Sequence, residues 1–598
     1  MMGRREQGQG RLFYEFCLDE AVPDDHLVRK IRALLDLSWV YAELAPYYSQ
    51  IGRPSIDPVL MIQMLIIGYV FAIRSERQIC REVQVNLAYR WFCDLGLEDA
   101  IPDASAFSRA RNERFRESDI FRHVFGGAVI PFPEAFGCRG RFMMGRQTSD
   151  QSRLFYSFNL EERIPAHHLL RRLNPIVTRL LADLRVRLRP FYSEIGRPSI
   201  DPELMLRMLI VGYCYGIRFE RKLCEDIELH LAYRWFCRLD LDDKVPDHST
   251  FSVNRHGRFR DSDIFRQLFE AVVRACMDAG LVKGEGFAVD ASVMEADASR
   301  YHGKAPDEID WSAPERQTRA VAEFLSGLDD VLPDVERKPP KVISPTDPCS
   351  AWTAKANKRV QFGYGLNYLV DIENAVIVDV EATPARTYDE VRATRTMIER
   401  TEQRLGLKPE RLMADTAYGT GKFLGWLVGT GITPHIPVWE RANRYDGTFS
   451  RSDFTFDAEK NQYTCPNGKA LRTTGRVHDG RTIRYRASKL DCDPCPLKAR
   501  CCPNAPERKV PRDVDEAARD IARVLMGTPE YERSRDERKR VEMRFAHLKT
   551  HHRFERMRLR GLTGARDEFH LAAIVQNLKT LSKHIWRPPP RGTAPGTA

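Results

Sequence analysis

Two long apolar runs in the first half of the chain predict buried helices. They follow Asp57-Pro58 and Asp201-Pro202, each of which places an N-cap acceptor before a proline at the first helical position. The first run, 59–73, is short for a bilayer span, and the second carries Arg207 where the first has Gln63. Since a charge at the centre of a span is costly, we expect helices within a protein core.

The same half of the chain contains an internal duplication. Five strings occur twice, beginning at Met1 and Met143 (MMGR), Arg11 and Arg153 (RLFY), Ile51 and Ile195 (IGRPSIDP), Leu87 and Leu231 (LAYRWFC), and Ser118 and Ser262 (SDIFR). Two copies are too few, and each is too long, for a solenoid array. The pattern predicts an all-α domain in two copies, 1–130 and 148–280, joined by a linker over 131–147. Because the second copy opens with its own MMGR, one hypothesis is a truncated reading frame fused upstream of a complete one.

From about Gly286 the apolar residues fall into short runs separated by turn residues, a pattern typical of β-strands. Five strands are predicted: FAVDAS (287–292), QFGYGLNYLVDI (361–372), AVIVDVEAT (375–383), RLMADTAYG (411–419) and ITPHIPV (432–438). Helices are expected over 390–405 and 421–428, and a partly helical polar segment over 298–357. Three strands that can form a meander, followed by strands alternating with helices, predict a mixed α/β sheet. The end, 586–598, has the composition of a disordered tail.

The charge of the chain suits a polyanionic partner, although a merely soluble protein can carry the same excess. Lys and Arg number 93 against 83 Asp and Glu, a formal charge of +10. The excess concentrates late in the chain, where 531–560 contains eleven Lys and Arg against five Asp and Glu within a predicted helix. The N-terminus has no apolar h-region, so the cytoplasm is the expected location.

Three carboxylates are the candidates for chemistry. Asp290 and Asp415 end the predicted strand sequences FAVD and RLMAD, at the strand termini where α/β sheets usually place their sites. Glu542 lies in a predicted helix, on which Arg538 and Lys549 are spaced to share its face. The alternative is that three acids among 83 form no cluster.

Converging carboxylates repel one another unless cations neutralise them, and their hard oxygen ligands suit Mg²⁺ or Mn²⁺. Two-metal phosphodiester chemistry requires such a set: one ion activates the attacking water or 3′-hydroxyl, and the other stabilises the leaving oxygen. Arg538 and Lys549 would then hold phosphates of the cleaved DNA strand.

Several motifs resemble the DDE transposases of bacterial insertion sequences. GRPSIDP, GIRFERKL, LAYRWF and PDHSTFS are similar to the helical N-terminal domain of that family. ISPTDPCSAW, FGYGLNYLVD, ADTAYG and the run from Val541 to Leu581 are similar to its ribonuclease-H-like core. The resemblance covers 143–581, and the first copy matches the N-terminal domain again.

The resemblance implies that Asp290, Asp415 and Glu542 are the catalytic triad and the metal ligands. Arg538, Glu542 and Lys549 fit the family signature around the glutamate, whereas the tyrosine position of that signature is Arg535 here. This departure leaves the triad intact and concerns only the role of the tyrosine.

The resemblance also implies an architecture and an activity. The fold would be a mixed five-stranded ribonuclease-H-like core over 281–440 and 526–585, with a β-rich, Cys-containing insertion over 441–525, preceded by two all-α copies. Such an enzyme binds terminal inverted repeats, cleaves DNA with two Mg²⁺ or Mn²⁺ ions and transfers 3′ ends to target DNA. It acts as a homodimer associated with the nucleoid. Two alternatives stay open: a nuclease that cuts without joining, and an inactive DNA-binding remnant obstructed by its extra N-terminal copy.

Two further clusters each allow two interpretations. Cys465, Cys492, Cys495 and Cys501, with Cys502 beside them, either hold a structural Zn²⁺ or stay reduced and stabilise the insertion. Arg255 and Arg258 follow a capped helix start, and they either enter a DNA groove or form a solvated arginine face on a helical bundle.

Overall fold

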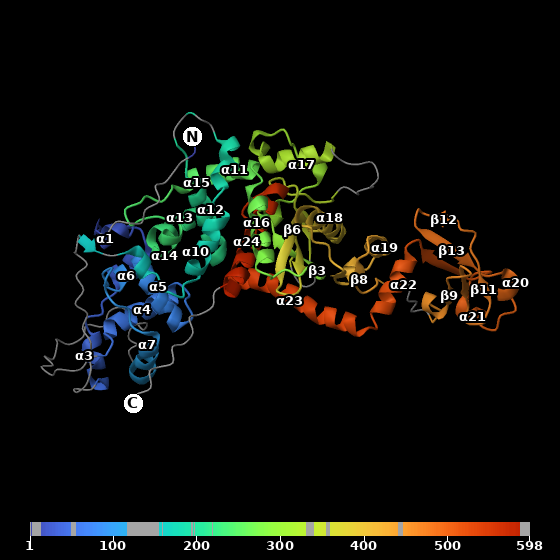
Figure 1. Cartoon of the computed structure of the whole chain (residues 1–598), viewed down its shortest axis with the longest axis horizontal. Coiled ribbons are helices and arrows are strands. Elements are labelled where there is room, and N and C mark those ends of the chain that lie inside the picture. The colour runs from blue at the N-terminus through green and yellow to red at the C-terminus, as the bar shows by residue number, and fades with distance from the viewer. Residues whose placement is uncertain are drawn as a thin grey trace. The chain divides into compact units, whose positions relative to one another are not determined.

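The computed structural model describes residues 2, 13–48, 55–115, 155–157, 159–192, 195, 198–217, 219–329, 340–354, 359–439 and 447–585. The expected linker over 131–147, the second MMGR string at Met143 and the expected tail over 586–598 lie outside these residues. The chain divides into two compact units, Met1–Ser262 and Asp263–Ala598 (Figure 1). Among the described helices, none has the length and apolar content needed to span a membrane.

The first unit is helical, with one small strand pair. Its earlier helices are α1 Leu18–Ala21, α2 Leu27–Leu34, α3 Val40–Leu44, α4 Pro58–Val70, α5 Glu76–Val85, α6 Leu87–Phe92 and α7 Ala104–Ala110. Its later helices are α9 Leu160–Arg163, α10 Leu169–Leu180, α11 Leu184–Leu188, α12 Pro202–Tyr215, α13 Glu220–Leu229, α14 Leu231–Phe236 and α15 His248–Asn254. Strand β1 (Phe13–Glu15) pairs antiparallel with β2 (Phe155–Ser157).

The buried helices predicted after Asp57 and Asp201 are confirmed. The carboxylate of Asp57 accepts a hydrogen bond from the Val59 amide at 2.8 Å, and α12 begins in the same way at Asp201. Arg207 is fully buried in α12, and its guanidinium donates to Glu203 at 2.9 Å and to Thr178 at 2.8 Å. A buried arginine is tolerated because its donors are paired.

The same polar triplet occurs in both halves of this unit. In the earlier half, the guanidinium of Arg111 donates to Glu76 at 2.8 Å and to the Tyr69 hydroxyl at 3.4 Å. In the later half, Arg255 donates to Glu220 and Tyr213 at 3.0 and 3.1 Å. The first triplet ties the end of the α7 segment to α4 and α5, and the second ties the end of the α15 segment to α12 and α13.

The second unit is built on a mixed six-stranded sheet. Its strands are β3 Gly286–Glu295, β4 Ala351–Thr353, β5 Gln361–Asp371, β6 Val376–Pro384, β7 Arg411–Met413 and β8 Thr433–His435. The order is β4-β5-β3-β7-β8, with β6 also paired to β5. Strands β3, β5 and β6 run antiparallel, whereas β3, β7 and β8 run parallel. All five predicted strands are present, and β4 is additional.

Helices cover this sheet. They are α16 Ile264–Asp278, α17 Arg319–Asp329, α18 Thr387–Leu405, α19 Gly421–Gly429, α23 Pro529–His551 and α24 Gly561–Ile585. Helices α16 and α24 pack on each other and on β6, α18 packs on β5 and β6, and α23 packs on β3. The helix α23 therefore brings a late stretch of the chain to the first strand of the sheet.

Between β8 and α23 lies a β-rich insertion made of two small antiparallel sheets. One contains β9 Thr455–Asp457, β10 Gln462–Thr464 and β11 Ala470–Leu471. The other contains β12 Val477–His478, β13 Thr482–Arg486 and β14 Lys509–Asp513. Short helices α20 (Lys489–Cys492) and α21 (Lys498–Cys501) end in two of its five cysteines, and α22 (Glu516–Leu525) leads into α23. A separate apolar core that includes Phe454, Tyr463, Tyr485 and Val510 holds the insertion together.

Candidate active site

Asp290 and Asp415 lie at the same level of two neighbouring parallel strands. Ala288 of β3 is the register partner of Met413 of β7, and each aspartate lies two residues beyond this pair. Asp290 is half-buried, and its Oδ1 accepts a hydrogen bond from the amide of Ala291 at 2.8 Å. The parallel register thus brings two of the predicted residues together.

Asp415 ends the strand segment and caps a short 3-10 turn, η8 (Thr416–Tyr418). Its Oδ1 accepts a hydrogen bond from the amide of Ala417 at 2.9 Å. This cap turns the chain away from the sheet directly after the aspartate. For that reason β7 is shorter than the strand predicted over 411–419.

A third carboxylate, Glu390, lies near this pair and was not among the predicted site residues. It belongs to the first turn of α18, which packs against η8. Tyr418 of η8 is buried, and burial together with the negative charges of Glu390, Asp290 and Asp415 raises the pKa of its hydroxyl well above the usual value. In the sequence, Glu390 could be found as an acid in the first turn of the helix that follows β6.

Glu542 lies in α23, and its side chain is 54% exposed. The guanidinium of Arg538 donates to Glu542 Oε1 at 3.2 Å, as their shared helix face predicts. Lys549, two turns further along, donates from Nζ to Ser292 Oγ at 2.7 Å. Ser292 follows Asp290 by two residues in β3, so α23 is tied to the strand of the first aspartate.

An aromatic contact fixes the same helix on the sheet. The rings of Phe545 in α23 and Tyr368 in β5 stack with centroids 4.9 Å apart and an interplanar angle of 13°. Tyr368 is the register partner of Asp290. Phe545 is three residues after Glu542, so this stacking lies within one helical turn of the glutamate.

The donors at this site are carboxylate oxygens, the ligand type that Mg²⁺ and Mn²⁺ prefer. Within the described ranges of the chain, no group of three or more His, Cys, Asp or Glu side chains is arranged to hold a metal ion. Asp290 and Asp415 are brought together by the sheet, and Glu542 is held on the adjoining helix by Arg538.

The five cysteines of the insertion line one small cavity of about 20 Å³. Cys492, Cys501 and Cys502 are buried, whereas Cys465 and Cys495 are half-buried. Burial raises the pKa of the Cys501 thiol to about 11. Zinc binding by Cys465, Cys492, Cys495 and Cys501 stays a prediction.

The expectation that Arg255 faces solvent or DNA is wrong. Its side chain is buried and paired with Glu220 and Tyr213, because the end of the α15 segment packs against α12 and α13. Arg258 is half-buried, and its guanidinium donates to Asn254 Oδ1 at 2.7 Å. Binding of DNA by Arg258 stays a prediction.

Comparison with protein families gives matches in both units. Residues 16–113 and 158–257 each match a family model described as a transposase domain (DUF772). Residues 464–582 match a model described as a transposase DDE domain. This second match contains the insertion from Thr464 onward, the helix with Glu542 and most of α24.

Proposed function

The chain belongs to the DDE transposases of insertion sequences, and on this basis we propose that it binds the terminal inverted repeats of its element, cleaves the DNA there and transfers the freed 3′ ends to target DNA. In the first step water attacks phosphorus, the bond to the 3′ oxygen breaks, and a 3′-hydroxyl is left. In the second step that hydroxyl attacks a phosphorus of target DNA and displaces a 3′ oxygen there.

Asp290, Asp415 and Glu542 are the catalytic carboxylates in this proposal. The observation that carries it is the pair of links at β3: the register with β7 sets Asp290 beside Asp415, and the Lys549–Ser292 hydrogen bond ties the helix of Glu542 to the same strand. These residues come from three distant parts of the chain, and these links connect the three segments that carry them.

The proposal assigns two Mg²⁺ or Mn²⁺ ions to these carboxylates. When bound, such ions lower the pKa of the attacking hydroxyl and stabilise the leaving oxygen. Arg538 and Lys549, on the helix face of Glu542, bind and orient phosphates of the cleaved strand. Structural zinc in the insertion would be separate from this chemistry.

We also assign the core to the ribonuclease-H-like fold and the first unit to a duplicated domain. The strand order β6-β5-β3-β7-β8, with the first three antiparallel and the last three parallel, supports the fold. The recurring Arg–Glu–Tyr triplet and the two matches to one family model support the duplication. The proposed boundaries are those expected from the sequence, with the core in two parts around the insertion.

The test uses the full chain, duplex DNA carrying the ends of the element, and Mg²⁺. We expect cleavage and joining by the natural protein, and loss of both in Asp290→Ala and Asp415→Ala. Asp536→Asn, which changes a 63% exposed carboxylate on α23, is the matched control. Undiminished cleavage by Asp290→Ala would overturn the assignment. Cutting without joining would identify a nuclease, and binding without cutting an inactive remnant. Light scattering of the DNA complex tests the proposed homodimer.

A further inference from the structure

The second sheet of the insertion has one apolar face and one polar, basic face. Side chains alternate along a strand, so residues two apart share a face. Tyr485 and Val510 point into the core of the insertion and are almost fully buried. Arg484 and Arg486 of β13 and Lys509 of β14 lie on the opposite face and are exposed.

Like charges stand directly opposite one another on this basic face. Arg486 is the register partner of Lys509 on one side and of Arg472 on the other. Like charges at directly opposed positions destabilise an antiparallel pair. The sheet carries this cost without compensating acids, because in the described part of the chain no carboxylate forms an ion pair with Arg472, Arg484 or Arg486. Lys509 has one long pair, to Glu507 at 3.8 Å.

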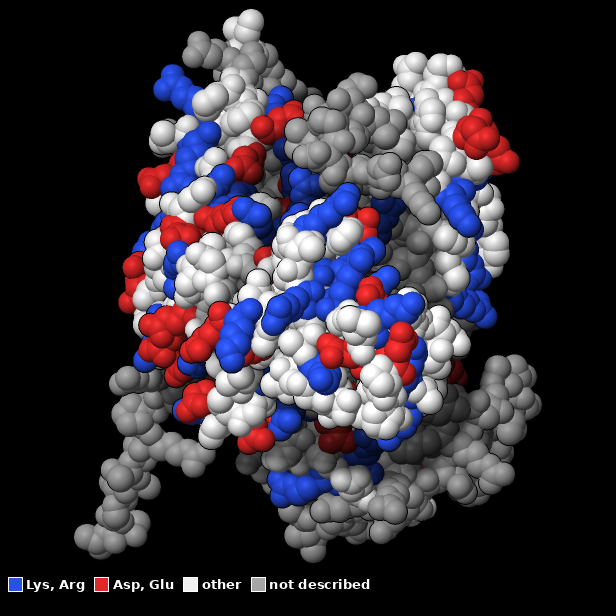
Figure 2. Space-filling model, turned by 90° about the vertical axis from the view of Figure 1, so that its right-hand side faces the viewer, with Lys and Arg blue, Asp and Glu red and all other residues white. Residues whose placement is uncertain are grey.

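The positive charge of this face affects the pKa of a neighbouring histidine. His478 of β12 is half-buried, and desolvation followed by the charges of Arg484 and Arg476 lowers the pKa of its imidazole. The side of the molecule on which the insertion lies in Figure 1 faces the viewer in Figure 2, where Lys and Arg side chains gather in a band. A surface of this kind attracts a polyanion.

A cavity of about 590 Å³ lies along the same strands, with lining residues from Arg508, just before β14, to Asp513. Thr482 and Asp513, which are register partners, line the cavity together with Thr420 and Gly421 at the start of α19. Because Thr420 follows Asp415 by five residues, the cavity adjoins the loop of a catalytic aspartate. The cavity therefore lies between the insertion and the loop that follows Asp415.

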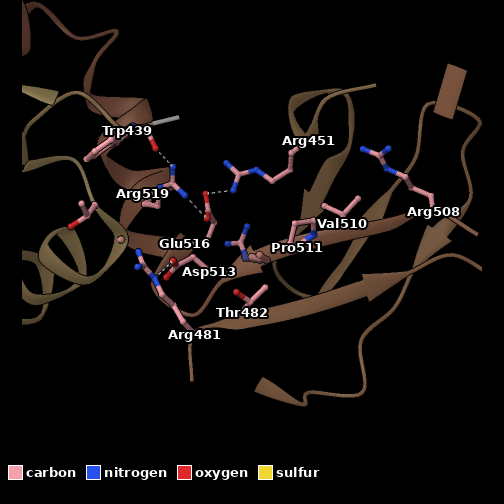
Figure 3. A pocket seen from close by; sticks show the side chains of 13 residues that line it. Trp439, Arg451, Arg481, Thr482, Arg508, Val510, Pro511, Asp513, Glu516 and Arg519 are labelled. Carbon is pink, nitrogen blue, oxygen red and sulfur yellow. Dashed lines mark hydrogen bonds and ion pairs between the residues drawn. The ribbon is translucent and has the colours of Figure 1, made fainter. Parts of the chain in front are cut away.

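Arginines dominate the lining of this cavity. It contains five of them against two carboxylates: Arg451, Arg481, Arg508, Arg512 and Arg519 against Asp513 and Glu516. Figure 3 shows Arg451 and Arg519 converging on Glu516, with N–O distances of 2.6 and 3.1 Å. Glu516 is fully buried, and although burial opposes ionisation, the neighbouring arginines lower its pKa.

The ionised Glu516 holds these guanidiniums in place. Arg481 pairs with Asp513 at 2.7 Å, and its side chain is still 54% exposed. A guanidinium binds phosphate through planar paired donors, so the exposed Arg481 is the arginine of this lining that is suited to a phosphate.

We propose that the β13–β14 face, with the arginine cavity along the same strands, binds the phosphodiester backbone of DNA next to the catalytic aspartates. This inference rests on the proposed function for the identity of the polyanion. Phosphate contacts fix the position of a strand without reading its sequence. The insertion would thus guide the strand into the active site, and the cavity would hold the phosphate nearest to Asp415.

The test measures how the affinity of the full chain for DNA depends on salt. The probe is a fluorescein-labelled 30-base-pair duplex of arbitrary sequence, and a labelled single strand of the same length is the second probe. Binding is measured by fluorescence anisotropy over a series of NaCl concentrations. Each lost phosphate contact reduces the slope of log K against log salt by about one. We expect a reduction of about two for the double variant Arg484→Gln/Arg486→Gln and about one for Arg481→Gln.

Lys460→Gln is the control, because Lys460 is a 70% exposed cation of the same insertion on its other sheet. We expect it to keep the natural slope. An unchanged salt slope in the double variant, with its thermal midpoint intact, would overturn the proposed binding of DNA by the basic face. An unchanged salt slope in Arg481→Gln would overturn the proposed binding of phosphate in the cavity.

Cleavage of end-containing DNA by the natural chain separates this inference from the proposed function. If the natural chain cleaves and the double variant keeps its slope, the inference fails and the function stands. If the natural chain does not cleave while the double variant loses slope, the function fails and the DNA-binding surface stands. If the double variant has a reduced salt slope with the single-stranded probe but not with the duplex, the face binds unpaired DNA.

Discussion

The ammonium of Lys549 donates a hydrogen bond to Ser292 Oγ at 2.7 Å and so joins the helix of Glu542 to the strand of Asp290. The proposed function gives Lys549 a role in binding phosphate. The contact adds a second role, in which the lysine keeps Glu542 near the aspartates before DNA arrives. Preorganisation of this kind lowers the cost of assembling a site when substrate binds.

Ser292→Ala separates these two roles of Lys549. It removes the acceptor and keeps the charge, so we expect a loss of about 1 kcal/mol in stability and a fall in the cleavage rate of about tenfold or less. Lys549→Met loses both roles, and we expect a larger fall in rate together with a smaller salt slope. The measurements are single-turnover cleavage and DNA anisotropy, with Lys539→Met, an exposed lysine of the same helix, as the control. A natural rate in Ser292→Ala would restrict Lys549 to phosphate binding.

Glu390 is expected to assist metal binding by the neighbouring aspartates. Its charge acts on the same buried Tyr418 as theirs, and removing a carboxylate next to metal ligands typically weakens metal affinity about tenfold or more. We expect Glu390→Gln to raise the Mg²⁺ concentration for half-maximal cleavage by about that factor while saturating Mg²⁺ restores much of the rate. Glu399→Gln, on the same helix and paired with Arg395, is the control. An unchanged Mg²⁺ requirement would exclude this role.

That Asp290 and Asp415 follow neighbouring strands could be predicted because strand ends leave a local pattern. FAVD and RLMAD each combine an apolar run with a terminal acid, and the parallel pairing of β3 and β7 then brings the two acids together. The periodicity of α23 predicts that Glu542 shares one helix face with Arg538 and Lys549. In each case the information lies within one helix or one strand.

What could not be predicted depends on partners far along the chain. Arg255 is buried because Glu220 and Tyr213 come from earlier helices, and helix periodicity cannot distinguish a charge facing solvent from a charge facing such a partner. The basic face of the insertion depends on the register between β13 and β14, which are separated by the cysteine helices. Such pairings exist only in the folded chain.

Asp347 makes the stability of the core depend on pH. It is fully buried, accepts hydrogen bonds from the Tyr364 hydroxyl at 2.5 Å and the Gly561 amide at 3.0 Å, and burial raises its pKa to about 6. Since the unfolded pKa is about 3.9, the folded state holds the proton more tightly, and the stability gained from it is lost as pH rises from about 4 to 6.

Asp347→Asn keeps the site neutral, so we expect its thermal midpoint to rise relative to the natural chain between pH 4 and pH 7. The free-energy change is about 3 kcal/mol at most, from a shift of about two pKa units. Parallel scans of Asp307→Asn, an exposed carboxylate, should follow the natural chain. A constant difference between Asp347→Asn and the natural chain would show that the carboxylate does not titrate in this range.

Arg255 is expected to stabilise the first unit and not to contact DNA. Arg255→Gln leaves Glu220 without its cation, which for a buried pair costs about 3 kcal/mol or more. We expect a lower thermal midpoint and an unchanged DNA salt slope measured below that midpoint. Arg258→Gln, in contrast, tests the remaining DNA-binding prediction in this segment. A reduced slope with an unchanged midpoint in Arg255→Gln would reverse the assignment.

The cysteine cluster of the insertion stays open to two interpretations, of which the Zn²⁺ interpretation predicts one ion per chain. Five thiols line a single cavity of about 20 Å³, and Cys465 Sγ and Cys495 Sγ accept hydrogen bonds from the Lys469 amide and the Asn467 side chain at 3.3 and 3.5 Å. A buried thiolate is stable only when hydrogen-bond donors and a cation offset its negative charge. Without a cation, burial favours the protonated thiol. Elemental analysis of the purified chain should give one zinc, lost in Cys495→Ser together with the thermal stability of the insertion, but kept in Cys276→Ser, which changes a buried cysteine of α16. Metal-free protein of natural stability, with every cysteine titrating as a thiol after unfolding, would instead establish the reduced cluster as a packing element.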